Sequence, residues 1–397
     1  MSAIKQNQSI LLIAGEASGD EHASLIVREL KNKYPDFQIW GMGGDKLQEA
    51  GMQVLLDIKT YASVMGFTEV IKKIKIISEG YQTLLRLAKK QKPDLVILVD
   101  YPGFNLRIAK DLKKIGCKIL YFISPQIWAW KKGRAKIIRK NIDQVAVIFP
   151  FEEKYLRDLG IKADFVGHPF SDRHELVVDR NEFLRSLDLN PQYQTLAILP
   201  GSRKDEIKKL LVPMCQAFLR LQAQKPELQA IIPIASTIDK NFVEQILKNA
   251  SLTINSKQIA FVNNQEIRRV FKVVDAGLLK SGTITMEGVL AELPFIVVYK
   301  VHPLTYYLGQ KIVTGIKNFA MPNIIAGREV VRELLQEQVN PECIAQELQD
   351  LLDNVSRRKQ IINDLRQIKE QLKGAGSFST MAKRTVGLIE KLLVKPV

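Results

Sequence analysis

Apolar and polar positions alternate in blocks along the whole chain. Short, almost purely apolar runs are typical of strands buried on both faces, and they alternate with segments whose apolar residues recur at i, i+3 and i+4, as in amphipathic helices. Strands are predicted at residues 9–14, 38–41, 95–99, 118–123, 144–147, 164–165, 195–199, 229–233, 258–262, 276–279 and 295–299, and the clearest helices at 20–33, 78–92, 206–224 and 241–249. The alternation predicts an α/β protein with parallel sheets.

The strand–helix pattern nearly restarts after Gly167-His168-Pro169, and the 397-residue chain is too long for one compact core. We predict two Rossmann-like, doubly wound domains facing a cleft, with ligands beyond the carboxyl ends of the strands. The predicted parts are domain 1–170, a polar linker 171–190, domain 191–340 and a helical segment 341–397, which packs either on its own chain or on a neighbour.

Charge narrows the choice of partner. The net charge of +16 indicates an anionic partner, which could be nucleic acid, a phosphorylated substrate or an acidic lipid surface. No nucleic-acid-binding motif and no metal-ligand spacing is present, so no nucleic acid and no metal is expected. Three separated cysteines indicate a reducing cytosol, and neither a signal peptide nor an apolar run of about 18 residues is found.

Two loops of the first half carry candidate acids. Residues 15–20 (GEASGD) follow a predicted strand and place Glu16, Ser18 and Asp20 where a helix opens. Helix capping by Ser18 or Asp20 is the alternative, but it does not account for Glu16. Asp100 ends the next buried run, in DYPGFN to Asn105, where burial would raise its pKa toward that of a general base; a simple turn residue is the alternative.

Two loops of the second half are candidate anion sites. Gly201, Ser202 and Arg203 follow one strand, and the run Ser281, Gly282 and Thr283 follows another, each just before a helix. Such helix starts and a guanidinium can hold a diphosphate, and Glu287, four residues after Thr283, could accept ribose hydroxyls. The alternative is ordinary helix capping with Arg203 and Glu287 solvated.

A third kind of segment is both apolar and basic. Residues 62–77 and the loop with Trp128 and Trp130 could contact acyl chains or an anionic membrane, or they could be a domain helix and core aromatics beside a basic surface. The candidate acyl or membrane residues are Val64, Met65, Phe67, Val70, Ile74, Trp128 and Trp130.

Seven motifs in register resemble the lipid-A-disaccharide synthase family over about residues 10–338. They are residues 15–20 (GEASGD), 100–105 (DYPGFN), 124–130 (SPQIWAW), 166–169 (VGHP), 199–203 (LPGSR), 280–283 (KSGT) with Glu287, and 321–328 (MPNIIAGR).

The resemblance implies an inverting, metal-independent GT-B glycosyltransferase that uses no cofactor. Its members join UDP-2,3-diacylglucosamine to 2,3-diacylglucosamine 1-phosphate at the inner face of the cytoplasmic membrane, giving the lipid A disaccharide 1-phosphate and UDP. A homodimer with exchanged C-terminal segments is also implied.

The resemblance further implies that Asp100 and Arg203 matter for activity, and that Glu16, Ser18, Glu287 and Asn323 lie in the active-site cleft. We assign Asp100, Arg203 and Glu16 to catalysis. The acceptor is assigned to Ser18, Asp20 and Asn105, and the nucleotide to Gly201, Ser202, Arg203, Ser281, Gly282, Thr283, Glu287 and Asn323. Many members carry a second aspartate where this chain has Gly103, so the role of base falls on Asp100.

Two other functions stay open on sequence alone. Another GT-B enzyme acting on UDP-GlcNAc, such as a 2-epimerase or a peptidoglycan glycosyltransferase, would not need the acyl-contacting segment. A basic module that binds RNA or membrane without catalysis would not need two anion sites.

Overall fold

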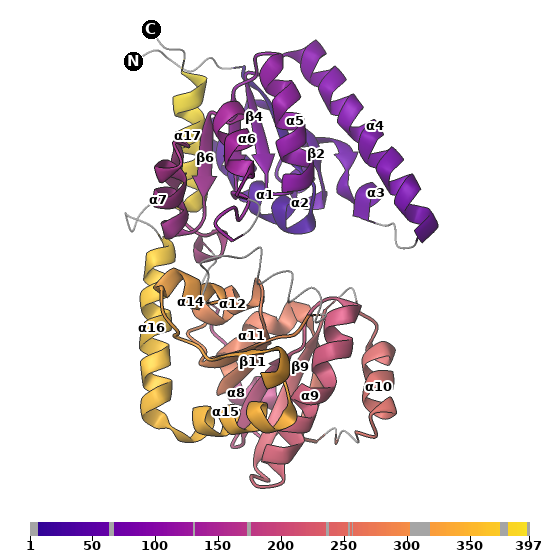
Figure 1. The fold of residues 1–397 in the computed structure, drawn as a ribbon, viewed down its shortest axis with the longest axis vertical. Helices are drawn as coiled ribbons and strands as arrows, with labels where there is room; N and C mark the ends of the chain where they lie inside the picture. The colour runs from indigo at the N-terminus through magenta and orange to yellow at the C-terminus, as the bar shows by residue number, and fades with distance from the viewer. Residues whose placement is uncertain are drawn as a thin grey trace. The chain divides into compact units, whose positions relative to one another are not determined.

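The computed structural model describes residues 7–62, 67–129, 132–172, 176–235, 238–252, 255, 257–301, 318–373 and 380–394. The chain forms two compact units (Figure 1). The first domain comprises Met1–Asp172 and Leu372–Val397, and the second comprises Arg173–Gln371. No helix among the described residues is long and apolar enough to cross a membrane.

The first domain is built on a seven-stranded parallel sheet of order β3-β2-β1-β4-β5-β6-β7. The strands at its centre, Leu95–Val99 and Ile119–Phe122, are fully buried, because helices cover both faces of the sheet (Figure 1). The strands are β1 (Ser9–Ala14), β2 (Gln38–Gly43), β3 (Gln53–Asp57), β4 (Leu95–Val99), β5 (Ile119–Phe122), β6 (Gln144–Val147) and β7 (Ala163–Phe165). The helices are α1 (Ala17–Lys33), α2 (Asp45–Glu49), α3 (Ile58–Ala62), α4 (Phe67–Gln91), α5 (Pro102–Lys114), α6 (Arg134–Asn141) and α7 (Pro150–Asp158), followed by a 3₁₀ turn, Pro169–Asp172.

The second domain repeats this plan with a six-stranded parallel sheet of order β10-β9-β8-β11-β12-β13. Its strands are β8 (Gln194–Leu199), β9 (Leu228–Ile234), β10 (Ile259–Asn263), β11 (Ala276–Lys280), β12 (Phe295–Tyr299) and β13 (Glu333–Leu335). Its helices are α8 (Arg180–Arg185), α9 (Lys204–Gln222), α10 (Lys240–Asn249), α11 (Ile267–Val273), α12 (Ile284–Leu290), α14 (Met321–Ala326), α15 (Pro341–Asp353) and α16 (Val355–Lys373), with 3₁₀ turns at Asn264–Glu266 and Gln336–Gln338.

The C-terminal segment is divided between the two domains. The sequence predicted one helical segment at residues 341–397. In the structure, α15 and almost all of α16 belong to the second domain. The last helix, α17 (Met381–Leu393), returns to the first domain and packs on α1 (Figure 1). There Tyr34 Oη donates a hydrogen bond to Glu390 (2.9 Å), and Lys118 Nζ donates one to the Leu392 carbonyl oxygen (2.6 Å).

Candidate active site

Each sheet has one place where the direction of winding reverses. In the first sheet it lies between β1 and β4, and in the second between β8 and β11. The loops after these strand pairs diverge to opposite faces and leave an open crevice, where doubly wound proteins bind their ligands. The paired ends are Ala14 with Val99 and Leu199 with Leu279, so the candidate loops predicted from sequence start side by side within each domain.

The backbone of Asp100 is held in an uncommon conformation at the first reversal point. Asp100 and Tyr101 both have left-handed φ angles, 42° and 46°. Such angles cost free energy in residues other than glycine and are concentrated at functional sites. Two side chains hold the Asp100 carbonyl oxygen, because Tyr121 Oη donates to it at 2.6 Å and Asn105 Nδ2 at 2.8 Å. Asn105 is fully buried and bonds the Asp100 carbonyl oxygen, so its side chain positions Asp100. A contact of this side chain with the acceptor sugar stays a prediction.

The pKa of the Asp100 carboxyl group is raised, which favours its neutral form. Burial and, to a smaller extent, the negative charge of Glu16 raise the pKa of Asp100 from 3.8 to about 6, although a hydrogen bond from the backbone N–H of Tyr101 opposes them. Glu16 is exposed at the N-cap of α1 and makes no side-chain cap bond. The two acids that the sequence singled out therefore interact electrostatically.

A close approach joins the two loops of this site. A Cβ atom on Gly15 would lie 2.2 Å from Cδ1 of Tyr101, so only glycine fits beside the tyrosine ring. The ring thereby keeps the loop after β1 against the loop after β4, which carry Glu16 and Asp100.

Asp20 has a structural role that the sequence did not reveal. Its buried carboxylate accepts the backbone N–H groups of Gly44 (2.6 Å), Lys46 (3.0 Å) and Leu47 (3.3 Å), and so caps α2 instead of its own helix. Contact of Asp20 with an acceptor would compete with these bonds. Ser18, by contrast, is exposed in the first turn of α1.

The predicted acyl-contacting residues are described only in part. Val64, Met65 and Trp130 lie outside the described residues. Phe67, Val70 and Ile74 belong to α4, but their side chains also lie outside them. Of the group, only the side chain of Trp128 can be located.

Trp128 is anchored to a buried acid. Its indole N–H donates to Glu152 Oε1 (3.0 Å). Its ring packs edge-on against that of Phe151, with 5.1 Å between the ring centroids. Burial raises the pKa of Glu152 to about 8, although the bonds from Trp128 and from backbone N–H groups oppose this. The hydrogen bond from Trp128 to this buried acid therefore holds the loop before α6 in place.

The second reversal point holds a cavity of about 310 Å³. The predicted residues Gly201, Ser202, Arg203, Gly282 and Thr283 all line it, so the two loops do meet. Gly201 has a φ of +122°, and a Cβ atom there would lie 2.5 Å from Glu206 Oε2, so glycine is required at this position.

Glu206 and Lys280 also line this cavity, although sequence reasoning missed both. Lys280 Nζ lies 3.0 Å from Glu206 Oε1, and their side chains are 20% and 18% exposed. Two signals could have found them: a glutamate at the third helical position after a Gly-rich loop, and a lysine ending a buried strand.

The other residues predicted to bind the nucleotide are less exposed to solvent. The Ser281 hydroxyl is buried and donates to the Phe319 carbonyl oxygen at 3.3 Å. Glu287 is half-buried on α12. Asn323 is fully buried: its amide donates to Val331 O and Glu333 Oε1 and accepts two backbone N–H groups. These four hydrogen bonds use all the donors and acceptors of the Asn323 amide and hold the chain between α14 and β13. A contact of this amide with the nucleotide would require one of the four bonds to break.

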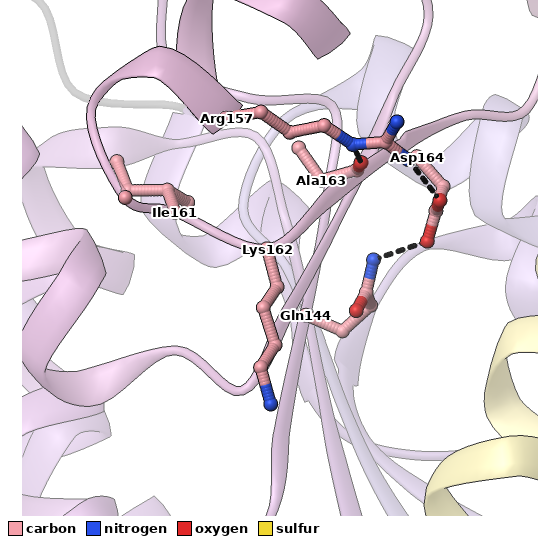
Figure 2. A pocket seen from close by; sticks show the side chains of 7 residues that line it. Gln144, Arg157, Ile161, Lys162, Ala163 and Asp164 are labelled. Atoms are coloured by element: carbon pink, nitrogen blue, oxygen red, sulfur yellow. Dashed lines mark hydrogen bonds and ion pairs between the residues drawn. The ribbon is translucent and has the colours of Figure 1, made fainter.

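Another hollow lies at the opposite, amino end of the first sheet (Figure 2). Three of its polar side chains are already paired within the hollow. Arg157 donates to the Ala163 carbonyl oxygen (2.8 Å) and to Asp164 (2.6 Å), and Gln144 also donates to Asp164 (2.6 Å). We therefore do not regard it as the active site. Among the described residues, no three His, Cys, Asp or Glu side chains are grouped to hold a metal ion.

Solved structures share this fold at low sequence identity. The S. aureus MnaA–UDP co-structure has a TM-score of 0.65 and 13% identity, over 98% of this chain and 99% of that one. The calicheamicin glycosyltransferase CalG4 has a TM-score of 0.60 and 14% identity, over 99% and 100%. Together with two parallel-sheet domains and loops at both reversal points, this defines a protein of the GT-B class.

The chain belongs to the lipid-A-disaccharide synthase family. The family model described as lipid-A-disaccharide synthetase matches residues 10–384. The lipid-A-disaccharide synthase of Coxiella burnetii (strain Dugway 5J108-111) is 39% identical over 96% of this chain and 99% of its own length, and that of Trichlorobacter lovleyi is 36% identical over 98% and 100%. The family and the GT-B fold predicted from the sequence motifs are thus confirmed.

Proposed function

We propose that the protein transfers a diacylglucosaminyl group from UDP-2,3-diacylglucosamine to the 6-hydroxyl of 2,3-diacylglucosamine 1-phosphate. The products are UDP and a β-1,6-linked disaccharide 1-phosphate, as expected of an enzyme of lipid A synthesis. The observation that carries the proposal is the family match over residues 10–384.

Asp100 is the proposed general base. Its carboxylate takes the proton of the acceptor 6-hydroxyl while that oxygen forms a bond to the anomeric carbon of the donor. The bond from that carbon to the diphosphate oxygen breaks, and its electron pair leaves with UDP, so the configuration inverts. A pKa of about 6 supports this role, because the group is ionised at neutral pH yet still has a useful affinity for a proton.

The second domain is proposed to stabilise the departing UDP. Arg203 and the loops around Gly201 and Gly282 line one cavity, where the guanidinium and loop N–H groups would offset the growing negative charge. Glu287 is proposed to accept hydrogen bonds from the ribose hydroxyls.

Membrane association at the inner face of the cytoplasmic membrane is part of the proposal. The start of α4 and the Trp128 loop would meet acyl chains. Exposed cationic residues at the end of this loop and on α6 support contact with anionic lipid; they include Lys132, Lys136, Arg139 and Lys140. Flotation with anionic and with uncharged vesicles tests this, and equal binding to both would contradict it. The homodimer stays a prediction.

The test of function is mass spectrometry of products from the two acylated sugars, with the wild-type protein, Asp100→Asn, and the exposed-site control Asp36→Asn. We expect the disaccharide from the wild type and the control, and none from Asp100→Asn, which should still bind UDP. Near-normal turnover by Asp100→Asn would remove Asp100 as the base. Conversion of UDP-GlcNAc to UDP-ManNAc without disaccharide formation would overturn the proposed function.

A further inference from the structure

One carboxylate of the protein accepts hydrogen bonds from donor groups around the cavity of the second domain. Glu206 Oε2 accepts the backbone N–H groups of Ser202 (3.1 Å) and Arg203 (3.4 Å). Glu206 Oε1 lies 3.0 Å from Lys280 Nζ and 3.7 Å from Arg203 Nη1. These are the groups that a bound phosphate would use, so the protein supplies its own anion at an anion site.

We infer that Lys280 is a second cation for the diphosphate of the nucleotide, and that Glu206 holds it until the nucleotide binds. The inference rests on the proposed function, because it assigns a partner to the same site. It assigns a role to Lys280, which lies in the motif 280–283 but was not among the predicted site residues.

The position of Lys280 favours this role. Its ammonium group pairs with Glu206 at the start of α9, and it lies 3.3 Å from the position that a Cβ atom on Gly282 would take. The side chain is only 20% exposed, so water screens its charge less than that of Arg203, which is 82% exposed. A partly buried ammonium lining a cavity binds an anion more strongly than an exposed one.

The charges indicate that Lys280 changes partner when UDP arrives. A diphosphate carries more negative charge than one carboxylate, so it competes successfully for the ammonium group. Glu206 then lies beside an anion and weakens its binding. When the sugar has been transferred, the return of Lys280 to Glu206 favours release of UDP.

Calorimetric titration with UDP and with uridine tests the inference, uridine serving to separate phosphate binding from nucleoside binding. The proteins are the wild type, Lys280→Met, Glu206→Gln and the control Lys208→Met, an exposed lysine of α9 that is not part of the described cavity lining. Glutamine can still accept the loop N–H groups, so Glu206→Gln keeps the helix cap.

Lys280→Met should weaken UDP binding by about 10- to 100-fold, the effect of losing one charge-assisted hydrogen bond, and leave uridine binding unchanged. Glu206→Gln should tighten UDP binding several-fold, and Lys208→Met should change neither ligand. Equal losses for UDP and uridine, or no loss, in Lys280→Met would overturn the role of Lys280. Weaker UDP binding by Glu206→Gln would overturn the role of Glu206 as a competitor. If the wild type bound no UDP at all, the proposed function itself would fall.

Discussion

Replacing Glu16 by glutamine should move the acid limb of the pH–rate profile to lower pH. Burial and the negative charge of Glu16 together raise the pKa of Asp100 to about 6. Glutamine has nearly the same shape as glutamate but no charge, so it removes the second cause and keeps the first. The pKa of Asp100 should therefore fall below about 6 but stay above its ordinary 3.8.

The size of the effect follows from the same values. The difference between 3.8 and about 6 corresponds to roughly 3 kcal/mol in favour of the neutral carboxyl group. A base with a pKa of about 6 is only about one-tenth ionised at pH 5, so kcat/KM of the wild type should be about tenfold lower at pH 5 than at pH 7. In Glu16→Gln more of Asp100 is ionised at pH 5, and the drop should be smaller.

The assay is kcat/KM from pH 4.5 to 8, normalised to the plateau of each variant. The acceptor phosphate also titrates near pH 6, so wild type and variant must be compared on the same acceptor. Glu21→Gln is the matched control: Glu21 is an exposed glutamate of α1 that is not among the influences on the pKa of Asp100. An acid limb that stayed in place in Glu16→Gln, or moved to higher pH, would refute the electrostatic coupling.

Three further predictions concern single side chains. Arg203→Ala should weaken UDP binding about tenfold or more by calorimetry, and an unchanged affinity would exclude Arg203 from the site. Because the pKa of Glu152 is raised from 4.5 to about 8, the folded protein keeps a proton that the unfolded chain loses. The free energy of unfolding should thus fall as pH rises from 4.5 to 8, and urea titrations should show a flatter dependence for Glu152→Gln. Asp20→Ala should destabilise the first domain by about 1–3 kcal/mol through loss of the α2 cap, seen as a lower Tm, whereas an unchanged Tm would contradict the capping role.

The central strands were predictable because they are apolar on both faces. β1, β4, β6 and β12 begin and end at the predicted residues. The prediction missed β3 and β13, which lie at sheet edges. In β3 the residues alternate between exposed and half-buried, and β13 has only three residues, so neither leaves a strong apolar run.

For the candidate site, the sequence predicted which loops matter but not how each side chain is used. Parallel strands end at one edge, so residues after β1, β4, β8 and β11 had to lie near reversal points once the sheet order was formed. The partners of Asp20 are backbone groups at the start of α2, and those of Asn323 are backbone groups and Glu333 near β13, so no local pattern marks either set. The Lys280–Glu206 pair likewise joins residues from different strand ends.

The residues proposed for the chemistry differ in the sign of their charge between the two reversal points, and the proposed reaction would need that difference. The proposed base, Asp100, would be effective only while its pKa stays raised. Burial and Glu16 raise this pKa, and a backbone N–H opposes them. A lysine or arginine beside Asp100 would pull its pKa down and weaken its affinity for the acceptor proton. A departing UDP would need such cations, and the proposed ones, Arg203 and Lys280, line the cavity of the other domain. Placing base and cations on separate sheets lets each keep the environment that its step requires, so moving a cation to the first reversal point should lower the rate even if UDP binding improved.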